Sequence, residues 1–223
     1  MKKVSCGAKI VDDLVGGLET DAITTIYGPA GAGKTNFALL AAVEIAKSGK
    51  KVIFVDTEGG FSVDRLKQIM PDYKRLFDRI MFLNPTTFEE QKQTIEKLKE
   101  LVNTKIGLIV VDTMTMLYRL ERSFKDEEYN RDLGVQMLQL NEIARKHNIP
   151  VLLTSQVYSS FDSNKVKIVG GDILTYASKC LLEVEQLHNG RRKLTLHKHR
   201  SVPSGQQVLF EIYDKGVKKV EKT

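Results

Sequence analysis

The sequence predicts an α/β fold, with a mainly parallel central sheet flanked by helices and with antiparallel strands near the C-terminus. Short apolar runs alternate with helix-like segments between residues 23 and 156, and this alternation is typical of a parallel sheet. The glycine-rich segment Gly28–Thr35 joins the first of these strands to a helix. After residue 178 the strand-like runs follow one another with only short turns between them, which predicts the antiparallel part.

The composition is that of a globular protein. Hydrophobic residues make up 42% and charged residues 28% of the 223 positions, which suits one domain over residues 1–223 with a sizeable core. No apolar run approaches the roughly 20 residues that span a bilayer, and no signal peptide is recognisable, so we expect a cytoplasmic protein. The net charge of +6 permits a polyanionic partner. Cys6 and Cys180 are expected to be buried, reduced thiols, and no Cys/His/Asp spacing suggests zinc.

The expected elements follow one another in a regular order. Strands are expected where β-branched or apolar runs occur, and helices where apolar residues recur at helical spacing. In chain order we expect a strand at Ile23–Tyr27, a helix at Asn36–Lys47, a strand at Lys51–Asp56, a short helix at Val63–Met70, a strand at Arg79–Leu83, a helix at Thr86–Val102, a strand at Gly107–Asp112, a helix at Tyr129–His147, a strand at Pro150–Gln156, and strands at Lys179–Leu187, Arg192–His199 and Val208–Tyr213.

Three of these elements carry specific signals. Thr86 and Glu89 have the spacing of a capping box at the start of a helix. The segment Gly107–Asp112 (GLIVVD) is apolar up to its last residue, which predicts a strand buried on both faces. The triplet His188–Gly190 predicts a tight turn between the first two C-terminal strands.

The segment Gly28–Thr35 reads GPAGAGKT and fills every fixed position of the phosphate-binding pattern G-x-x-x-x-G-K-[ST]. Its glycines let the backbone curl so that successive N–H groups face phosphates. Lys34 would place a charge on the β- and γ-phosphates, and the hydroxyl of Thr35 would ligate Mg²⁺. We therefore expect ATP and Mg²⁺ as cofactors. The predicted nucleotide-binding residues of this segment are Gly28, Pro29, Ala30, Gly31, Ala32, Gly33, Lys34, Thr35 and Asn36.

Two acidic residues are candidates for the rest of the site. Asp112 ends a hydrophobic strand and would share the magnesium site with Thr35, by holding a water of the metal. Hydrolysis also needs a base that orients water, and Thr113 occupies the position after Asp112 where many such enzymes carry a glutamate. Glu58, at the tip of the neighbouring strand, is the candidate base. A solvated loop glutamate fits the residue pattern of Glu58 equally well.

An ordered set of motifs resembles the RecA/RadA recombinase superfamily, and within it the short archaeal paralogues of RadA. The set covers nearly the whole chain and is far more specific than the phosphate loop alone. It consists of GPAGAGKT, VDTEGGFSVDRL (Val55–Leu66), LIVVDTMTMLYR (Leu108–Arg119), LLTSQV (Leu152–Val157) and a Gly170-Gly171 pair before a helix. The resemblance implies a RecA-like P-loop NTPase core.

The resemblance also implies roles within the nucleotide site. Glu58 becomes the water-orienting catalytic base, beside the catalytic cation Lys34. Gln156 would sense the γ-phosphate and pass its state to the loop that follows, because an amide can donate to a phosphate oxygen without adding charge. Arg65 would stack on adenine, and Pro203 would cap the base from a neighbouring segment.

Two loops contact DNA in this superfamily, and the resemblance places them at Leu120–Gly134 and Tyr158–Gly171. Basic side chains there would bind backbone phosphates, and aromatic rings would stack on bases. A mobile loop of mixed charge would show the same residue pattern. The predicted DNA-binding cations are Arg122, Lys125, Arg131, Lys165 and Lys167.

Departures from the family pattern narrow the implied function. Strand-exchange recombinases of this group carry an N-terminal DNA-binding domain and a linker that joins subunits into a filament, whereas this sequence begins almost at the core. We therefore expect an ATP- and DNA-binding accessory protein with weak ATPase activity. The partners implied by the resemblance are single-stranded or branched DNA, the main RadA recombinase and Holliday junction resolvase.

The segment Lys198–Arg200, followed by Pro203, resembles the K-x-R-x-x-P segment of KaiC-like ATPases. There a lysine and an arginine reach the γ-phosphate of the adjacent subunit, so Lys198 and Arg200 would act in trans within a homo-oligomer, from the end of a strand at the antiparallel edge. An exposed basic strand end is the alternative. This leaves three functions open: a DNA-dependent ATPase of recombination, an ATP-gated adaptor, and a KaiC-like or DnaB-like ring-forming ATPase.

Overall fold

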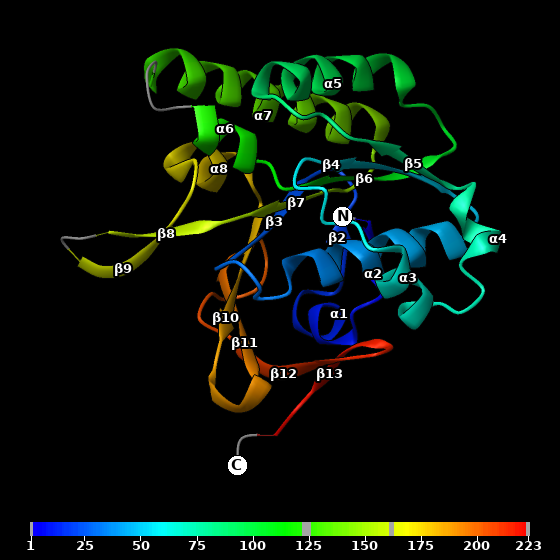
Figure 1. The fold of residues 1–223 in the computed structure, drawn as a ribbon, viewed down its shortest axis with the longest axis vertical. Helices are drawn as coiled ribbons and strands as arrows, with labels where there is room; N and C mark the ends of the chain where they lie inside the picture. Colours follow the sequence, from blue (N-terminus) through cyan, green and yellow to red (C-terminus); the bar gives the residue numbers. More distant parts are fainter. Residues whose placement is uncertain (1, 122–125, 161–162, 222–223) are drawn as a thin grey trace.

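A nine-stranded sheet forms the centre of the computed structural model, which describes residues 2–121, 126–160 and 163–221 (Figure 1). Its strand order is β13-β12-β11-β10-β3-β7-β6-β4-β5. Every pair from β10 to β5 is parallel, and β10, β11, β12 and β13 pair antiparallel with one another. The strands are β3 (Ile23–Tyr27), β4 (Lys51–Asp56), β5 (Ile80–Leu83), β6 (Ile106–Asp112), β7 (Val151–Ser155), β10 (Cys180–Gln186), β11 (Arg192–Lys198), β12 (Gln207–Tyr213) and β13 (Gly216–Lys219).

The predicted fold class is confirmed, and β10 is the junction between the two parts of the sheet. It pairs in parallel with β3 through Cys180 and Thr24, and antiparallel with β11 through Gln186 and Arg192. The expected turn between β10 and β11 is a short 3₁₀ segment, His188–Gly190, in which Asn189 adopts a left-handed conformation with φ of 60°.

Helices cover both faces of the parallel strands (Figure 1). Alternate side chains of each strand supply the two faces: Val52 and Phe54 belong to one core, and Ile53 and Val55 to the other. One core includes residues of α1 (Lys9–Val15) and α2 (Lys34–Lys47), with α3 (Val63–Ile69) and α4 (Lys74–Phe77) packed against it. The other core is covered by α5 (Phe88–Leu101), α6 (Met116–Glu121), α7 (Asp126–His147) and α8 (Gly171–Ala177).

Element ends and short elements depart from the sequence-based expectations. Helix α5 is capped by Thr87, whose hydroxyl accepts a bond from the Glu90 amide at 3.1 Å, while the Glu90 carboxylate accepts from the Thr86 amide at 2.7 Å. The predicted box of Thr86 with Glu89 is therefore wrong by one residue. The elements α1, α4, α6 and β13 and the two-residue strands β1 (Lys3–Val4) and β2 (Leu18–Glu19) were not expected, because segments of two to seven residues carry little periodic signal.

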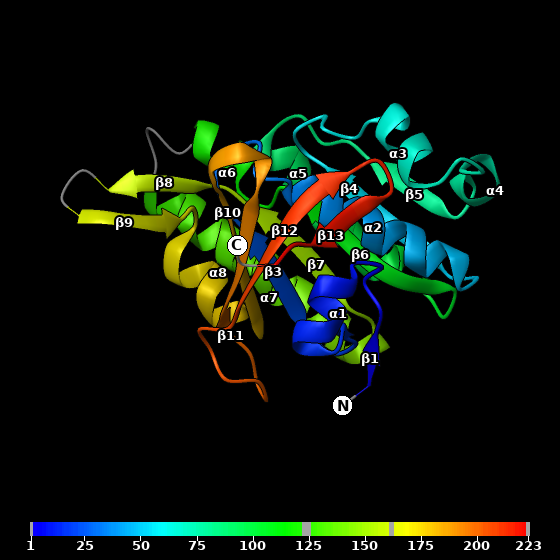
Figure 2. The same ribbon diagram turned by 90° about the horizontal axis from the view of Figure 1, so that it is seen from below.

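Both segments that were expected to be DNA-contacting loops are largely regular structure. Helix α6 extends to Glu121 and α7 begins at Asp126, so most of Leu120–Gly134 is helical. Arg122 and Lys125 lie outside the described residues. In the second segment, β8 (Val157–Ser160) and β9 (Ser163–Ile168) form an antiparallel hairpin that extends away from the main sheet (Figure 2). Tertiary context overrode the loop expectation in both places.

Other expectations concern chemistry rather than elements. Cys6 and Cys180 are both buried and free, as expected. Within the ranges that the structure describes, no helix has the length and apolar character needed to cross a bilayer.

The parallel strands place chemically important loops together. Because β3, β4, β6 and β7 run in the same direction, their carboxyl ends meet at one edge of the sheet. The loop at Gly28, the segment around Glu58, the side chain of Asp112 and the residue Gln156 follow these four strands. The sheet therefore brings residues from four distant parts of the chain to one place.

Two glycine substitutions test this packing. A Cβ at Gly28 would lie 2.1 Å from the carbonyl oxygen of Val184 in β10, so Gly28→Ala should lower the free energy of unfolding by about 2 kcal/mol or more. Gly134 in α7 has no heavy atom within 4 Å of an added Cβ, so Gly134→Ala should raise it by roughly 0.5–1 kcal/mol. Urea denaturation measures both values, and equal effects of the two changes would contradict this packing.

Candidate nucleotide-binding site

The phosphate-loop segment lies between β3 and α2, as its pattern predicts. Gly33 caps α2 with φ of 102°, in the left-handed region that favours glycine. The first N–H groups of α2 then point out of the helix end without helical acceptors, and a helix N-terminus of this kind suits an anion. The loop is held from outside by β10, because Gly28 packs directly against Val184. This backbone arrangement is a cradle for phosphates.

Lys34 is folded into this cradle. Its side-chain amine donates to the carbonyl oxygens of Gly28 at 3.0 Å and Pro29 at 2.9 Å, and the residue is only 6% exposed. Burial lowers the pKa of Lys34, while the charges of Glu58 and Asp112 oppose that shift. A cation buried beside carbonyl dipoles gains strongly from an anionic ligand. Phosphate oxygens would supply the charge that the carbonyls lack.

Asp112, at the end of β6, is almost fully buried and accepts a hydrogen bond from the hydroxyl of Thr154 in β7. Its pKa is raised to about 6 because burial outweighs the stabilising bonds from the Thr154 and Thr35 hydroxyls. A nearby cation would restore full ionisation. The carboxylate of Asp112 and the hydroxyl of Thr35 are oxygen donors of the kind that Mg²⁺ prefers.

These two residues fit a shared Mg²⁺ site rather than an all-protein one. Among the described residues, no group of three or more His, Cys, Asp and Glu side chains could hold a metal ion. Mg²⁺ is usually held by one or two protein oxygens together with substrate phosphates and waters. The metal would therefore be bound jointly by Thr35, Asp112 and a polyphosphate.

Glu58 is positioned by the residue that ends its own strand. The carboxylate of Asp56 in β4 accepts hydrogen bonds from the backbone amides of Glu58, Gly60 and Phe61 at 3.0–3.2 Å. Asp56 is 4% exposed, so this turn is anchored from the protein interior. The neighbouring Thr57 exchanges hydrogen bonds with the backbone of Thr113. The turn that carries Glu58 is therefore held in place, while the Glu58 residue itself is exposed.

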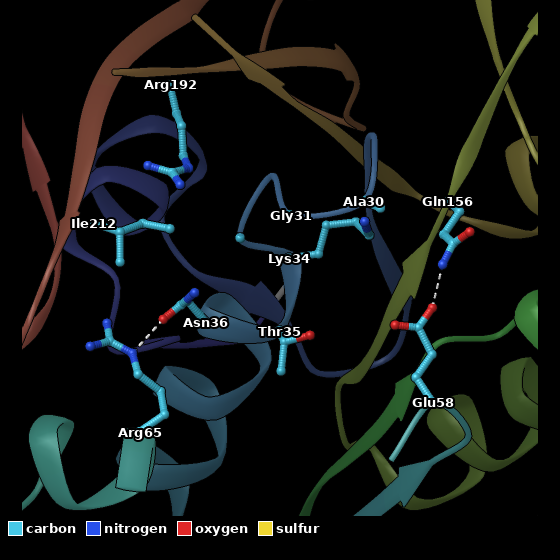
Figure 3. A pocket seen from close by; sticks show the side chains of 11 residues that line it. Ala30, Gly31, Lys34, Thr35, Asn36, Glu58, Arg65, Gln156, Arg192 and Ile212 are labelled. Carbon is cyan, nitrogen blue, oxygen red and sulfur yellow. Dashed lines mark hydrogen bonds between the residues drawn. The ribbon is translucent and has the colours of Figure 1, made fainter. Parts of the chain in front are cut away.

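The predicted base and the predicted phosphate sensor are in direct contact. The amide of Gln156 donates to the carboxylate of Glu58 at 2.5 Å (Figure 3). The backbone carbonyl of Gln156 accepts from the amide of Val169, just after β9. Gln156 therefore connects the end of the phosphate cleft to the base of the β8–β9 hairpin. Sequence reasoning named both residues but did not predict their bond.

Arg65 is the most fully bonded side chain in the site. Its five N–H donors go to the side chains of Asn36 and Gln68 and to the carbonyls of Tyr213, Asp214 and Gly216. It thereby ties α3 to the β12–β13 hairpin. With every donor used in the plane of the guanidinium, only its faces remain for a ligand. This supports the expected stacking on adenine.

These groups line one cavity of about 470 Å³ (Figure 3). The Glu58–Gln156 pair lies at one end of the cavity, and Arg65 and Ile212 lie at the other, with the phosphate loop between them. The lining residues are Ala30, Gly31, Gly33, Lys34, Thr35, Asn36, Glu58, Arg65, Gln156, Arg192 and Ile212. Asp112 lies buried beside Thr35.

Three predicted residues lie far from this cavity. The β11–β12 connection carries Pro203, and it lies at the other end of the sheet, because Lys198 pairs with Leu181 near the start of β10. Pro203 therefore cannot cap a base in the cleft of its own subunit. Lys198 donates to the Thr175 carbonyl at 2.7 Å, and Arg200 pairs with Glu19 and Asp21. Strand β11 is an inner strand, so its expected position at the sheet edge is wrong.

The predicted DNA contacts are only partly described. Arg131 is exposed on α7 and Lys167 is exposed on β9. The backbone of Lys165 lies in β9, but its side chain is outside what the structure describes. Arg131 and Lys167 belong to different elements, and neither is among the lining residues of the cavity.

Two lining residues were missed by the sequence analysis. Ile212 packs against the phosphate loop, with its Cδ1 atom 2.4 Å from where a Cβ on Gly33 would lie. Arg192 donates to the backbone carbonyl of Ala32 in that loop at 3.0 Å. Strand alternation was the available signal, since Leu194 and Leu196 share the face of Arg192.

Comparison with known proteins agrees with the architecture. The model of the Rad51 family matches residues 1–220. The DNA repair and recombination protein RadB of Methanobrevibacter smithii is 40% identical, over 96% of this chain and 95% of that protein. RadB of Thermococcus sibiricus is 38% identical, over 98% of this chain and 96% of that protein. A solved structure described as the crystal structure of the RadB recombinase has a TM-score of 0.83 and 36% identity, over 97% and 99% of the two chains.

These matches confirm two predictions made from the motifs. The resemblance to the RecA/RadA superfamily, and to its short archaeal paralogues, is confirmed by both the family match and the RadB relatives. The RecA-like core is confirmed by the structural match, which covers the mainly parallel sheet and the antiparallel C-terminal strands.

Two substitutions separate binding from catalysis in the cleft. Lys34→Ala should abolish tight ATP binding, because no other lining residue places an amine among the loop carbonyls. Glu58→Gln should retain ATP binding and lower turnover roughly 10²- to 10⁴-fold, since only water activation is removed. Calorimetry gives the affinities and phosphate release gives the rates. Turnover at the wild-type rate in Glu58→Gln would show that Glu58 is not the base.

Proposed function

Because this chain belongs to the Rad51 family, we propose that it is an ATP- and DNA-binding accessory protein of DNA repair and homologous recombination. Proteins of this family bind nucleotides and act on DNA in recombination. The observation that carries the proposal is the contact of Glu58 with Gln156 beside the phosphate loop. This contact joins the part of the cleft that would hold the γ-phosphate to the hairpin that would meet DNA.

ATP with Mg²⁺ is the proposed ligand of the cleft. The cradle around Lys34 suits the β- and γ-phosphates, and the flat face of Arg65 suits a purine. Thr35 and Asp112 would share the metal with the phosphates. When bound, Mg²⁺ would neutralise phosphate charge and polarise the bond to the transferred phosphoryl group.

Turnover is proposed to be weak, and the site offers a physical reason. One oxygen of the Glu58 carboxylate, Oε1, accepts a hydrogen bond from the Gln156 amide, so the proposed sensor occupies part of the proposed base. If Gln156 turned to a γ-phosphate oxygen, it would release Glu58 for that role. Hydrolysis would then depend on a rearrangement of the sensor, and DNA held at the hairpin would bias that rearrangement through the Val169–Gln156 backbone bond.

The proposed DNA surface centres on the β8–β9 hairpin, with a contribution from α7. Tyr158 is 46% exposed and Lys167 is also exposed, which gives one ring for stacking and one cation for a phosphate. Arg131 on α7 adds a second exposed cation. Lys165, Arg122 and Lys125 remain predicted contacts. Single-stranded or branched DNA is the proposed form, since stacking requires unpaired bases.

The protein partners of the proposal are the main recombinase and Holliday junction resolvase. Their support is the family membership and the RadB relatives, whose name describes DNA repair and recombination. A homo-oligomer is proposed for a separate reason: Lys198 and Arg200 lie at the end of the sheet opposite to the phosphate loop of their own subunit. They can only meet a γ-phosphate that a second subunit holds.

ATPase rates with and without DNA test the overall proposal. We expect slow hydrolysis that single-stranded or branched DNA alters several-fold at most, and no strand unwinding. Strong stimulation by DNA together with unwinding would instead favour the KaiC-like or DnaB-like ring ATPase.

DNA affinity should depend on salt through the hairpin lysines. Neutralising Lys165 and Lys167 together should reduce the slope of log K against log salt by up to about 2, roughly one unit for each lost phosphate contact. The matched control is Lys9→Ala with Lys67→Ala, because these exposed lysines pair with Asp13 and Asp64 on helices of the opposite face. Equal slopes for the hairpin variant and the wild type would place the DNA site elsewhere.

The trans role of Lys198 and Arg200 predicts complementation. Arg200→Ala and Lys34→Ala should each be nearly inactive, yet a mixture should regain activity, because one subunit supplies the intact cleft and the other the cation. A cation supplied in trans contributes roughly 10³- to 10⁵-fold to rate in other phosphoryl-transfer enzymes. Phosphate release at several mixing ratios measures the effect. If the mixture stays inactive, the trans role of Arg200 is wrong, and its pairs with Glu19 and Asp21 give it a structural role within its own subunit.

A further inference from the structure

The outer wall of the phosphate loop is built by a hairpin from the far C-terminal part of the chain. Strand β10 touches the loop at Gly28 through Val184, and the side-chain nitrogen of Gln186 lies 3.1 Å from where a Cβ on Gly31 would be. The next residues form the His188–Gly190 turn, and β11 then begins at Arg192. Two glycines of the loop, Gly28 and Gly31, are thus covered by residues from a distant part of the chain.

Strand register fixes which way Arg192 points. Arg192 lies directly opposite Phe210 of β12, so the two side chains share one face of the sheet. Leu194 and Leu196, two and four residues further along β11, are fully buried in the core on that same face. Arg192 is therefore the first residue of an inward-facing row, and it projects beyond the apolar core over the phosphate loop.

Arg192 differs from Arg65, the other arginine of the cleft, in how many of its N–H donors have protein acceptors. Arg192 uses its Nε for the Ala32 carbonyl at 3.0 Å and one Nη1 hydrogen for the Gly190 carbonyl at 2.9 Å. A guanidinium has five N–H donors, so three remain without an acceptor in the described part of the chain. Arg65, by contrast, has committed all five to protein oxygens.

The position of Arg192 along the cavity selects the part of the ligand that it can reach. Figure 3 shows Arg192 on the same side of the loop as Ile212 and Arg65, and away from the Glu58–Gln156 pair. The latter pair marks the γ-phosphate end, and Lys34 lies between the two sides. A nucleotide in this orientation has only one anionic group on the nucleoside side, its α-phosphate.

We propose that Arg192 is a nucleotide-binding residue that donates hydrogen bonds to the α-phosphate of a nucleotide held by its own subunit. This rests on the proposed function of the cleft. Charge-assisted bonds from a guanidinium to phosphate oxygens are short and strong, and Arg192 is already anchored to the loop that it would assist. The β10–β11 hairpin would then belong to the nucleotide site. ATP and ADP would gain equally from Arg192, because both carry an α-phosphate.

Calorimetric titration with Mg²⁺ and ADP, with a non-hydrolysable ATP analogue and with adenosine tests the assignment. Arg192→Ala should lower the affinity for ADP and for the ATP analogue by the same factor, roughly tenfold or more, and leave the affinity for adenosine unchanged. Arg192→Gln should give a similar loss while its amide keeps a donor for Ala32, so a loosened hairpin is not the cause. Arg192→Lys should fall between the wild type and Arg192→Ala.

The matched control is Lys193→Ala. It removes the same charge one residue away, from the opposite face of β11, where Lys193 pairs with Glu185 at 2.8 Å. This variant should bind all three ligands as the wild type does. Loss of affinity for adenosine as well as for ADP in Arg192→Ala would make the residue purely structural. Loss of affinity for the ATP analogue alone would place Arg192 on the γ-phosphate. Unchanged affinity for both nucleotides would overturn the assignment.

The wild-type protein separates this inference from the proposed function. If the wild type binds both nucleotides and Lys34→Ala binds neither, the proposed nucleotide site is supported, independently of the result for Arg192. A wild-type chain that binds neither nucleotide would overturn the proposed function itself.

Discussion

The site depends on one constraint, which is that four parallel strands end at the same edge of the sheet. β3, β4, β6 and β7 are hydrogen-bonded neighbours with a common direction, so the residues after them must converge. Buried acids at two of these ends then fix the local geometry. The Asp56 carboxylate accepts hydrogen bonds from three backbone amides of the Glu58 turn, and the Asp112 carboxylate accepts one from the Thr154 hydroxyl. Without this alignment, Lys34, Glu58 and Gln156 would be unrelated residues.

The parts of the site that sequence predicts well are those with short-range causes. The phosphate loop is a continuous segment in which the glycine spacing, the strand before and the helix after all agree, so the place of Lys34 and Thr35 between β3 and α2 could be predicted from the chain alone. Asp112 follows from the same logic, because an acidic residue that ends a fully apolar strand is locally conspicuous. Glu58 cannot be separated from a solvated loop residue by its local pattern, because only long-range pairing brings Gln156 to it.

The parts that sequence predicts poorly depend on long-range pairing. The bond of Gln156 with Glu58 joins positions 98 residues apart, and that of Arg192 with Ala32 joins positions 160 apart. Only the strand order and the register bring them together. The same cause explains one error. Pro203 was expected to cap the base, but the antiparallel direction of β11 carries the β11–β12 connection to the other end of the sheet.

In the cleft, the groups proposed to bind the nucleotide are in place, whereas the group proposed to activate water is bonded to another side chain. Lys34, Arg65 and Arg192 give the cleft three cations, whereas the proposed base is bonded to the sensor that should respond to ATP. The central claim is that ATP separates this pair. A crystal structure with Mg²⁺ and a non-hydrolysable ATP analogue tests it most directly. Gln156 should then donate to a γ-phosphate oxygen and leave Glu58 facing a water. A bound analogue with the Glu58–Gln156 bond still intact would contradict the account.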